Sequence, residues 1–246
     1  LFAGPGWNPA WPDIFARSVA PITALTADHA RPSRAPNALQ RAEDPARFAA
    51  DQFAGFLAAH GITVSATNPV PTPADATELA HVDSLPVSAI AEVVLAQSDN
   101  DAAETLLWPV ALERGRPATP ADGAAVLTTE LQRLGLWGDG RAVLDGTGTA
   151  SGHLVTPDAL VGAVRMALAD PALRTITEGL PVAGVTGTLR ERFGADDSLR
   201  GRGMVRAKTG TIRGVNTLTG YVVTADGQPL AFAMMTSGGA GQTSAR

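Results

Sequence analysis

Apolar residues recur at helical spacing in the first half of the chain, beginning with the stretch 44–61. One face of this stretch carries Ala49, Phe53, Phe56 and Leu57, and Gly61 follows it as a typical helix stop. We therefore expect a helix that buries this face. Prolines interrupt the following segment, 68–79, and predict irregular structure there.

Two further helices are predicted on either side of a short polar junction, Ser98-Asp99-Asn100. The first covers 86–97, and its stripe consists of Ile90, Val93, Val94 and Gln97. The second covers 100–114, and its inward residues are expected to be Ala103, Leu106, Leu107 and Val110. Pro109 lacks a backbone N–H, so we expect it to bend this second helix.

Two later helices share a start signal. Thr119-Pro120 and Thr156-Pro157 each place a capping hydroxyl directly before a first-turn proline. Asp122 and Asp158 follow in the first turn, where the helix dipole favours a negative charge. Both sites predict helix starts.

After residue 200 the pattern changes from helical to extended. Three runs, 204–212, 216–225 and 230–237, are of β type, and Asp226-Gly227 between the last two is a strong hairpin signal. Both faces of the hairpin are apolar, so we expect helices to cover the sheet on both sides. The predicted fold class is α+β, with an antiparallel sheet between layers of helices.

Composition restricts the classes of function. The 246 residues carry a formal net charge of −5 and no basic cluster, which argues against a nucleic-acid partner. No apolar run approaches the ~20 residues of a membrane span, so no transmembrane segment is expected in the chain. The first forty residues are rich in Pro, Ala and Arg and predict a loop or the trailing edge of a preceding domain.

Cysteine and histidine offer little metal chemistry. The chain contains no cysteine, which excludes a thiolate nucleophile and a cysteine metal site. Its four histidines, at positions 29, 60, 81 and 153, share no metal-ligand spacing and are interpreted as surface or core residues. We assign no metal and no cofactor. Its four tryptophans are interpreted as packing groups.

One basic residue stands apart. Lys208 is the only lysine, and arginine supplies every other cation among the 19 basic residues. A lysine offers a compact point charge with a tunable pKa, whereas arginine offers a wide, permanently charged fork. Lys208-Thr209-Gly210 lies on a predicted strand and lacks the Gly-rich context of a phosphate-binding loop.

Taken singly, the two polar motifs are weak. Ser98 before a helix is usually a cap, and Lys-Thr-Gly at a strand end is usually a turn. In this order and about 110 residues apart, however, Ser-Asp-Asn and Lys-Thr-Gly are two of the three motifs of serine acyl-transferases that bind penicillin. The chain resembles the D-alanyl-D-alanine carboxypeptidase/endopeptidase family of class C, low-molecular-mass penicillin-binding proteins (PBP4-type, S13).

The third motif of that family, Ser-x-x-Lys, is missing. The sole lysine is Lys208 and Val205 stands three residues before it, so the nucleophile motif does not occur here. The resemblance implies that the chain is the C-terminal part of the enzyme. It also implies two regions, with 1–25 as the trailing edge of an inserted domain and 26–246 as the C-terminal part of the peptidase domain.

The resemblance also implies roles for individual residues. Ser98 would relay a proton to the departing amine, Asn100 would hold the substrate amide or a neighbouring lysine, and Lys208 would face Ser98 and the substrate carboxylate. Thr209, Gly210 and Thr211 would bind the substrate along the strand by β-addition. The loop Asp145-Gly146-Thr147-Gly148 is either a family loop beside the site or a tight turn.

For the complete protein, the resemblance implies a penicillin-sensitive peptidase that acts outside the cytoplasm on peptidoglycan peptides ending in D-Ala-D-Ala, with β-lactams as acylating inhibitors. Two alternatives remain open. A β-lactamase shares these motifs, and a noncatalytic peptidoglycan-binding scaffold would fit the absence of the nucleophile.

Overall fold

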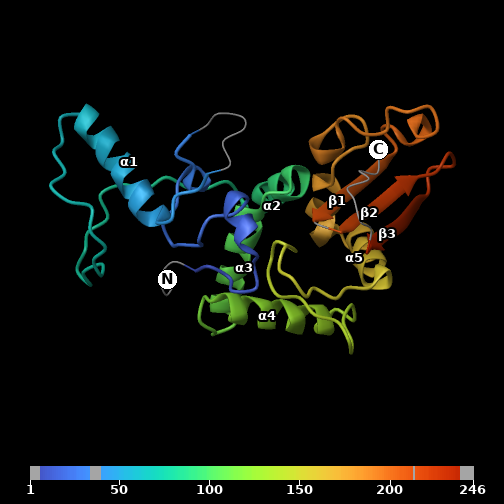
Figure 1. Ribbon diagram of the computed structural model, residues 1–246, viewed down its shortest axis with the longest axis horizontal. Coiled ribbons are helices and arrows are strands. Elements are labelled where there is room, and N and C mark those ends of the chain that lie inside the picture. Colours follow the sequence, from blue (N-terminus) through green and yellow to red (C-terminus); the bar gives the residue numbers. More distant parts are fainter. Residues whose placement is uncertain (1–5, 34–39, 213, 239–246) are drawn as a thin grey trace.

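The computed structural model describes residues 6–33, 40–212 and 214–238, which form an elongated molecule (Figure 1). Helix α1 and the extended segment after it lie at one end, and the β-sheet lies at the other. Helices α2, α3 and α4 lie between them. Within these ranges, no helix combines the length and the apolar character that crossing a bilayer requires.

Helix α1 covers Pro45–Ala59, as predicted, but most of its apolar face is not buried. Asp44 caps the helix by accepting a hydrogen bond from the backbone N–H of Arg47. Ala49 is buried, whereas Phe53 and Phe56 are 63% and 67% exposed. The expectation of a buried face was wrong for these two residues, because only the first turns of α1 pack against the segment around residue 30.

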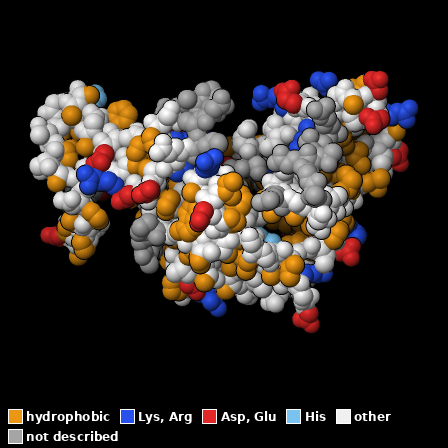
Figure 2. Space-filling model, in the orientation of Figure 1, with side chains coloured by type: hydrophobic (Ala, Val, Ile, Leu, Met, Phe, Trp, Pro, Cys, Tyr) orange, Lys and Arg blue, Asp and Glu red, His pale blue; other side chains and the backbone are white. Residues whose placement is uncertain are grey.

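The segment 62–85 is extended and exposed, in agreement with its prolines. It contains no helix or strand, and Leu79 and Val82 are almost fully exposed. Figure 2 shows apolar side chains at the surface of this end of the molecule.

Helices α2 (Val87–Gln97) and α3 (Asn100–Glu113) have the predicted bounds to within a residue. In α2, however, Val93 and Gln97 of the predicted stripe are exposed. In α3 the buried residues are Glu104, Leu107, Trp108 and Ala111, and the predicted inward residue Val110 is 41% exposed. The large Trp108 side chain and the hydrogen-bonded Glu104 set the inward face, so the stripe is rotated from the predicted one.

The main core joins α3 to the start of the chain. Its buried members are Trp11, Val19, Ile22, Leu107, Trp108, Ala118 and Ala150. Trp7 packs against this core and meets Trp11 edge to face, with ring centroids 5.1 Å apart. Residues from the first 25 positions therefore pack directly on α3, and the tryptophans in this core act as packing groups.

Helices α4 (Pro120–Arg133) and α5 (Pro157–Ala169) begin where the sequence predicts. The Thr119 hydroxyl accepts from the N–H of Asp122, and the Thr156 hydroxyl accepts from the N–H of Ala159. A short helix, α6 (Arg174–Gly179), follows α5 and packs against α2.

Three antiparallel strands form the sheet, in the order β1-β2-β3. They cover Val205–Ile212, Val215–Val223 and Pro229–Ser237. A turn at Asp226-Gly227 joins β2 to β3, and Gly227 adopts a φ of 84°, which suits glycine. The antiparallel pairing of β2 with β3 confirms the predicted hairpin. Strand β1 pairs with β2, and Lys208 lies opposite Thr219.

The two faces of the sheet meet different partners. Val205 and Ala207 pack with Leu189 of the segment 182–193, which contains the 3₁₀ turn η4 (Gly187–Leu189). Side chains alternate along a strand, so Lys208 points to the opposite face, where it meets Ser98 at the end of α2. The predicted combination of helices and an antiparallel sheet is confirmed, although Leu230 and Met234 of β3 remain more than half exposed.

Candidate active site

The junction between α2 and α3 presents Ser98 in an unusual backbone conformation. Ser98 ends α2 with φ 59° and ψ 48°, the left-handed region, and its N–H donates to the carbonyl of Val94. A non-glycine residue in this region costs about 1–2 kcal/mol. Asp99 then starts α3, because its carboxylate accepts from the N–H of Ala102 at 3.0 Å. The turn therefore holds the Ser98 side chain away from both helices.

Lys208 reaches this turn from the middle of β1. Its Nζ donates to Ser98 Oγ at 2.7 Å and to the carbonyl of Thr209 at 2.7 Å. Burial removes water from the ammonium and lowers the pKa of Lys208 to about 8. A helix junction and a strand 110 residues apart thus bring a hydroxyl and an amine with a lowered pKa into contact.

Four predicted residues remain, and Asn100 and Gly210 lie near this pair in the chain and on the strand. Asn100 is the first residue of α3, and within the described ranges its carboxamide makes no hydrogen bond. Gly210 lies on the same face as Lys208. A Cβ at Gly210 would lie 2.3 Å from Thr217 Oγ1, so no larger residue fits there without a shift.

Thr209 and Thr211 point to the other face of β1. The Thr209 hydroxyl donates to Thr188 Oγ1 at 2.9 Å, which links the strand to η4, and Thr211 is exposed. No sequence pattern singled out Thr188. Its hydroxyl is the one that fixes the Thr209 rotamer in this structure.

The outer edge of β1 is only partly occupied. Ala207 N–H donates to the carbonyl of Pro181. In an antiparallel strand, the backbone N–H groups of every second residue point to the same edge. The N–H groups of Thr209 and Thr211 therefore point to the same outer edge as that of Ala207. Neither donates to another backbone group among the described residues. An extended peptide could therefore pair with this end of β1.

The loop 145–148 is held by two buried carboxylates. Glu104 is fully buried and accepts from Trp108 Nε1 at 3.1 Å and from the N–H of Gly146 at 2.6 Å. Burial raises the pKa of Glu104, and these two hydrogen bonds act against that rise. One carboxylate on α3 thereby fixes both a tryptophan of the core and the loop.

The pKa of Asp145 is shifted in the opposite direction from that of Glu104. Its carboxylate accepts from Trp11 Nε1 at 2.6 Å, from the N–H groups of Gly148 and Ala150, and from His153 Nε2 at 3.0 Å. Burial opposes ionisation, but these donors outweigh burial and hold the pKa of Asp145 at about 2. These hydrogen bonds hold the loop as a tight turn.

The comparison with protein families gives one match that covers almost the whole chain. The model of the D-Ala-D-Ala carboxypeptidase 3 (S13) family matches residues 5–246. Among curated proteins, carboxypeptidase DacB of Mycolicibacterium smegmatis is 32% identical over 243 residues, which cover 97% of this chain and 52% of that protein.

A second relative and a solved structure agree with this match. The D-alanyl-D-alanine carboxypeptidase of Actinomadura sp. is 34% identical over 213 residues, which cover 83% of this chain and 39% of the relative. The crystal structure of penicillin binding protein 4 from Haemophilus influenzae, complexed with a β-lactam, is similar to this chain. The match covers 80% of this chain and 46% of the chain in that structure. It superposes with a TM-score of 0.71 at 27% identity. The chain spans about half the length, or less, of the curated relatives it matches.

Proposed function

Because this chain belongs to the D-Ala-D-Ala carboxypeptidase 3 (S13) family, we propose that it forms part of a serine-type D-Ala-D-Ala carboxypeptidase or endopeptidase. The substrate is a stem peptide or cross-link of peptidoglycan, and the protein acts outside the cytoplasm, where that substrate lies. The nucleophilic serine comes from a part of the protein outside this chain, since Lys208 is the only lysine and no Ser-x-x-Lys is present.

The observation that carries the proposal is the 2.7 Å contact between Lys208 Nζ and Ser98 Oγ. Because the ammonium donates to the serine oxygen, the hydroxyl proton of Ser98 points elsewhere and is free to be donated. The nucleophilic serine loses its proton to the lysine of its own Ser-x-x-Lys motif and adds to the D-Ala carbonyl carbon. The bond to the terminal amine breaks, which leaves an acyl-enzyme that water hydrolyses. Ser98 gives its proton to that amine, and Lys208, with a pKa near 8, replaces it.

The remaining site residues bind the substrate. Lys208 stabilises the negative charge of the terminal carboxylate in a partly desolvated site. Thr209 and Thr211 point to the other face of β1, so they bind the peptide through their backbone N–H groups at the strand edge. Gly210 allows the peptide to lie close to β1, and the free backbone edge of that strand pairs with it. Asn100 directs its carboxamide to the substrate amide or to a neighbouring lysine.

A test uses the longer protein and a fluorescent penicillin. We expect covalent labelling of the unchanged protein, and we expect Lys208→Ala to slow acylation about 100-fold or more, because a preorganised charge near the reacting groups is lost. Arg165→Ala, which removes an exposed cation on α5, is the matched control and retains the normal rate.

Two results would contradict the proposal. Labelling of a serine within residues 1–246 would show that the nucleophile lies in this chain, and an unchanged rate in Lys208→Ala would remove the lysine from the site. Rapid turnover of a chromogenic β-lactam, in place of a long-lived acyl-enzyme, would identify a β-lactamase. Binding of peptidoglycan without labelling would identify a noncatalytic scaffold.

A further inference from the structure

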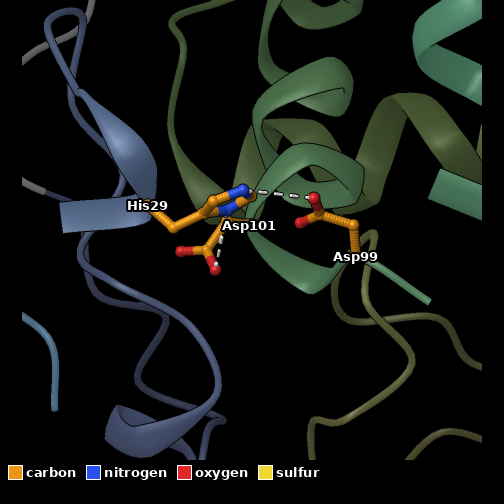
Figure 3. A group of neighbouring side chains, drawn as sticks. All are labelled: His29, Asp99 and Asp101. Atoms are coloured by element: carbon orange, nitrogen blue, oxygen red, sulfur yellow. Dashed lines mark ion pairs between the residues drawn. The ribbon is translucent and has the colours of Figure 1, made fainter. Parts of the chain in front are cut away.

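Beside the Ser98 turn, a histidine from a distant segment lies between two carboxylates (Figure 3). His29 Nε2 lies 3.4 Å from Asp99 Oδ2, and His29 Nδ1 lies 3.4 Å from Asp101 Oδ2. Asp99 and Asp101 are the N-cap and a first-turn residue of α3. The imidazole therefore connects the loop around residue 29 to the start of the helix that follows Ser98.

The geometry favours the charged form of His29. Both ring nitrogens face carboxylate oxygens, and both can donate only when the ring is an imidazolium. In agreement, the hydrogen bond to Asp101 raises the pKa of His29, burial acts against this, and the charge of Asp99 adds to the rise. Arg31, on the same loop, lowers it, and Arg31 itself pairs with Asp28.

The three side chains lie close enough to share a metal ion, but the surrounding charges favour an ion-pair bridge. The guanidinium of Arg41 lies 3.5 Å from Asp101 Oδ2, the same oxygen that faces His29. Two cationic side chains thus already balance the carboxylates, and a divalent cation would have to displace one of them.

The backbone around His29 adopts a strained conformation that aims the ring at α3. Asp28, His29 and Ala30 have φ angles of 51°, 55° and 52°, three consecutive non-glycine residues in the left-handed region. Such strain persists only where surrounding contacts enforce it, and it is common at functional sites. The contacts that His29 makes in this conformation are those with the Asp99 and Asp101 carboxylates.

The carboxylates also hold the start of α3 through their other oxygens. Asp99 Oδ1 accepts from the N–H of Ala102 at 3.0 Å, and Asp101 Oδ1 accepts from the N–H of Ala20 at 2.7 Å. A shift of either carboxylate would therefore move the first turn of α3. Since Ser98 directly precedes Asp99, such a shift would also change the distance from Ser98 Oγ to Lys208.

We propose that His29 is a positioning residue: by bridging Asp99 and Asp101 it fixes the α2–α3 turn that presents the Ser98 hydroxyl to Lys208. This role rests on the proposed acyl-transfer function. His29 touches neither the substrate nor the reacting atoms, and it acts through the two aspartates alone.

The test measures acylation of the longer protein by a fluorescent penicillin. His29→Asn removes the bridge, and asparagine tolerates the left-handed backbone at this position. We expect its acylation rate at acid pH to fall about tenfold, the loss that a missing charge-assisted hydrogen bond produces. His81→Asn is the matched control, because His81 is exposed and pairs with Glu78, far from the Ser98 turn in the chain.

A pH series separates positioning from a merely structural role. The folded-state pKa of His29 is raised, so the bridge is complete below that pKa and weakens as the pH rises through it. The rate ratio of unchanged protein to His29→Asn should therefore be largest near about pH 6 and decline toward about pH 8.5. Titration of Lys208 affects both proteins and cancels in the ratio.

Each outcome decides the proposal. A ratio of one at every pH, or a ratio above one that does not change with pH, would overturn the positioning role while labelling of the unchanged protein still supports the proposed function. Absence of labelling in the unchanged protein would overturn both. His29→Gln gives a second variant in case His29→Asn does not fold, and the same decline of the ratio is expected for it.

Discussion

At the scale of single residues, the chemistry depends on one ammonium. Arginine supplies the other cations of this chain, yet the residue that contacts Ser98 Oγ is lysine. Only a compact donor can reach Ser98 Oγ and the Thr209 carbonyl at once from the middle of a strand. Burial also gives this amine a pKa near 8, so it can exchange a proton near neutral pH.

The titration of Lys208 predicts the alkaline limb of the pH profile. Its folded-state pKa is lowered to about 8, so the ammonium is present below that pH and is lost above it. The acylation rate of the longer protein should therefore decline above about pH 8. In Lys208→Arg the acylation rate should be lower at every pH, because the wide guanidinium does not fit the site. Its rate should not decline above about pH 8, because the guanidinium stays charged.

Measurement of the acylation rate constant between about pH 6 and 10 checks this prediction, with Arg165→Lys as a control that leaves the site intact. An equal decline in Lys208→Arg would assign the limb to another group. A wild-type rate that stays constant to about pH 10 would show that the ammonium is not required.

At the scale of elements, the site depends on close packing of η4 against the end of α2. Gly187 has a φ of 56°, and a Cβ there would lie 2.3 Å from the carbonyl oxygen of Ala96, two residues before Ser98. The neighbouring Thr188 hydroxyl holds Thr209 of β1. One short turn thus contacts both elements that carry the site.

Gly187→Ala should separate these elements. The added methyl group meets backbone, and the left-handed φ adds strain of about 1–3 kcal/mol, so we expect slower acylation and a lower Tm. Gly55→Ala is the matched control, because no atom lies within 4 Å of its Cβ, and alanine in a helix is favoured by about 0.5–1 kcal/mol. Wild-type acylation in both variants would contradict the importance of this packing.

Local signals predicted the elements well and their buried faces less well. The caps at Thr119 and Thr156 and the turn at Asp226-Gly227 depend on chemistry within a few residues, and all three were predicted correctly. The inward face of α3 was not predicted correctly. A hydrophobic pattern does not identify a glutamate as a core residue, yet Glu104 is buried and hydrogen-bonded.

Contacts between distant segments were predictable only where a resemblance supplied them. Nothing local places Ser98 beside Lys208, and the family motifs alone suggested that pair. His29 was interpreted as an ordinary surface or core histidine, because no spacing rule connects it with carboxylates some 70 residues away. The Glu104 and Asp145 networks were missed for the same reason.

At the scale of the whole molecule, the described residues divide into a packed body and an exposed end. One core cluster joins α3 to the first 25 residues, and the other joins β1 to the segment 182–193. Phe53, Phe56, Leu79 and Val82 are exposed on α1 and the segment after it. The two elements of the site, the α2–α3 turn and β1, both lie away from that exposed end.

The most direct measurement of the central claim is a crystal structure of the longer protein acylated by a penicillin. We predict that the acylated serine belongs to a Ser-x-x-Lys motif outside residues 1–246 and lies within hydrogen-bond reach of Ser98 Oγ. The penicillin carboxylate should lie against Lys208, beside the β1 edge formed by Thr209 and Thr211. An acylated serine remote from Ser98 and Lys208 would contradict the account.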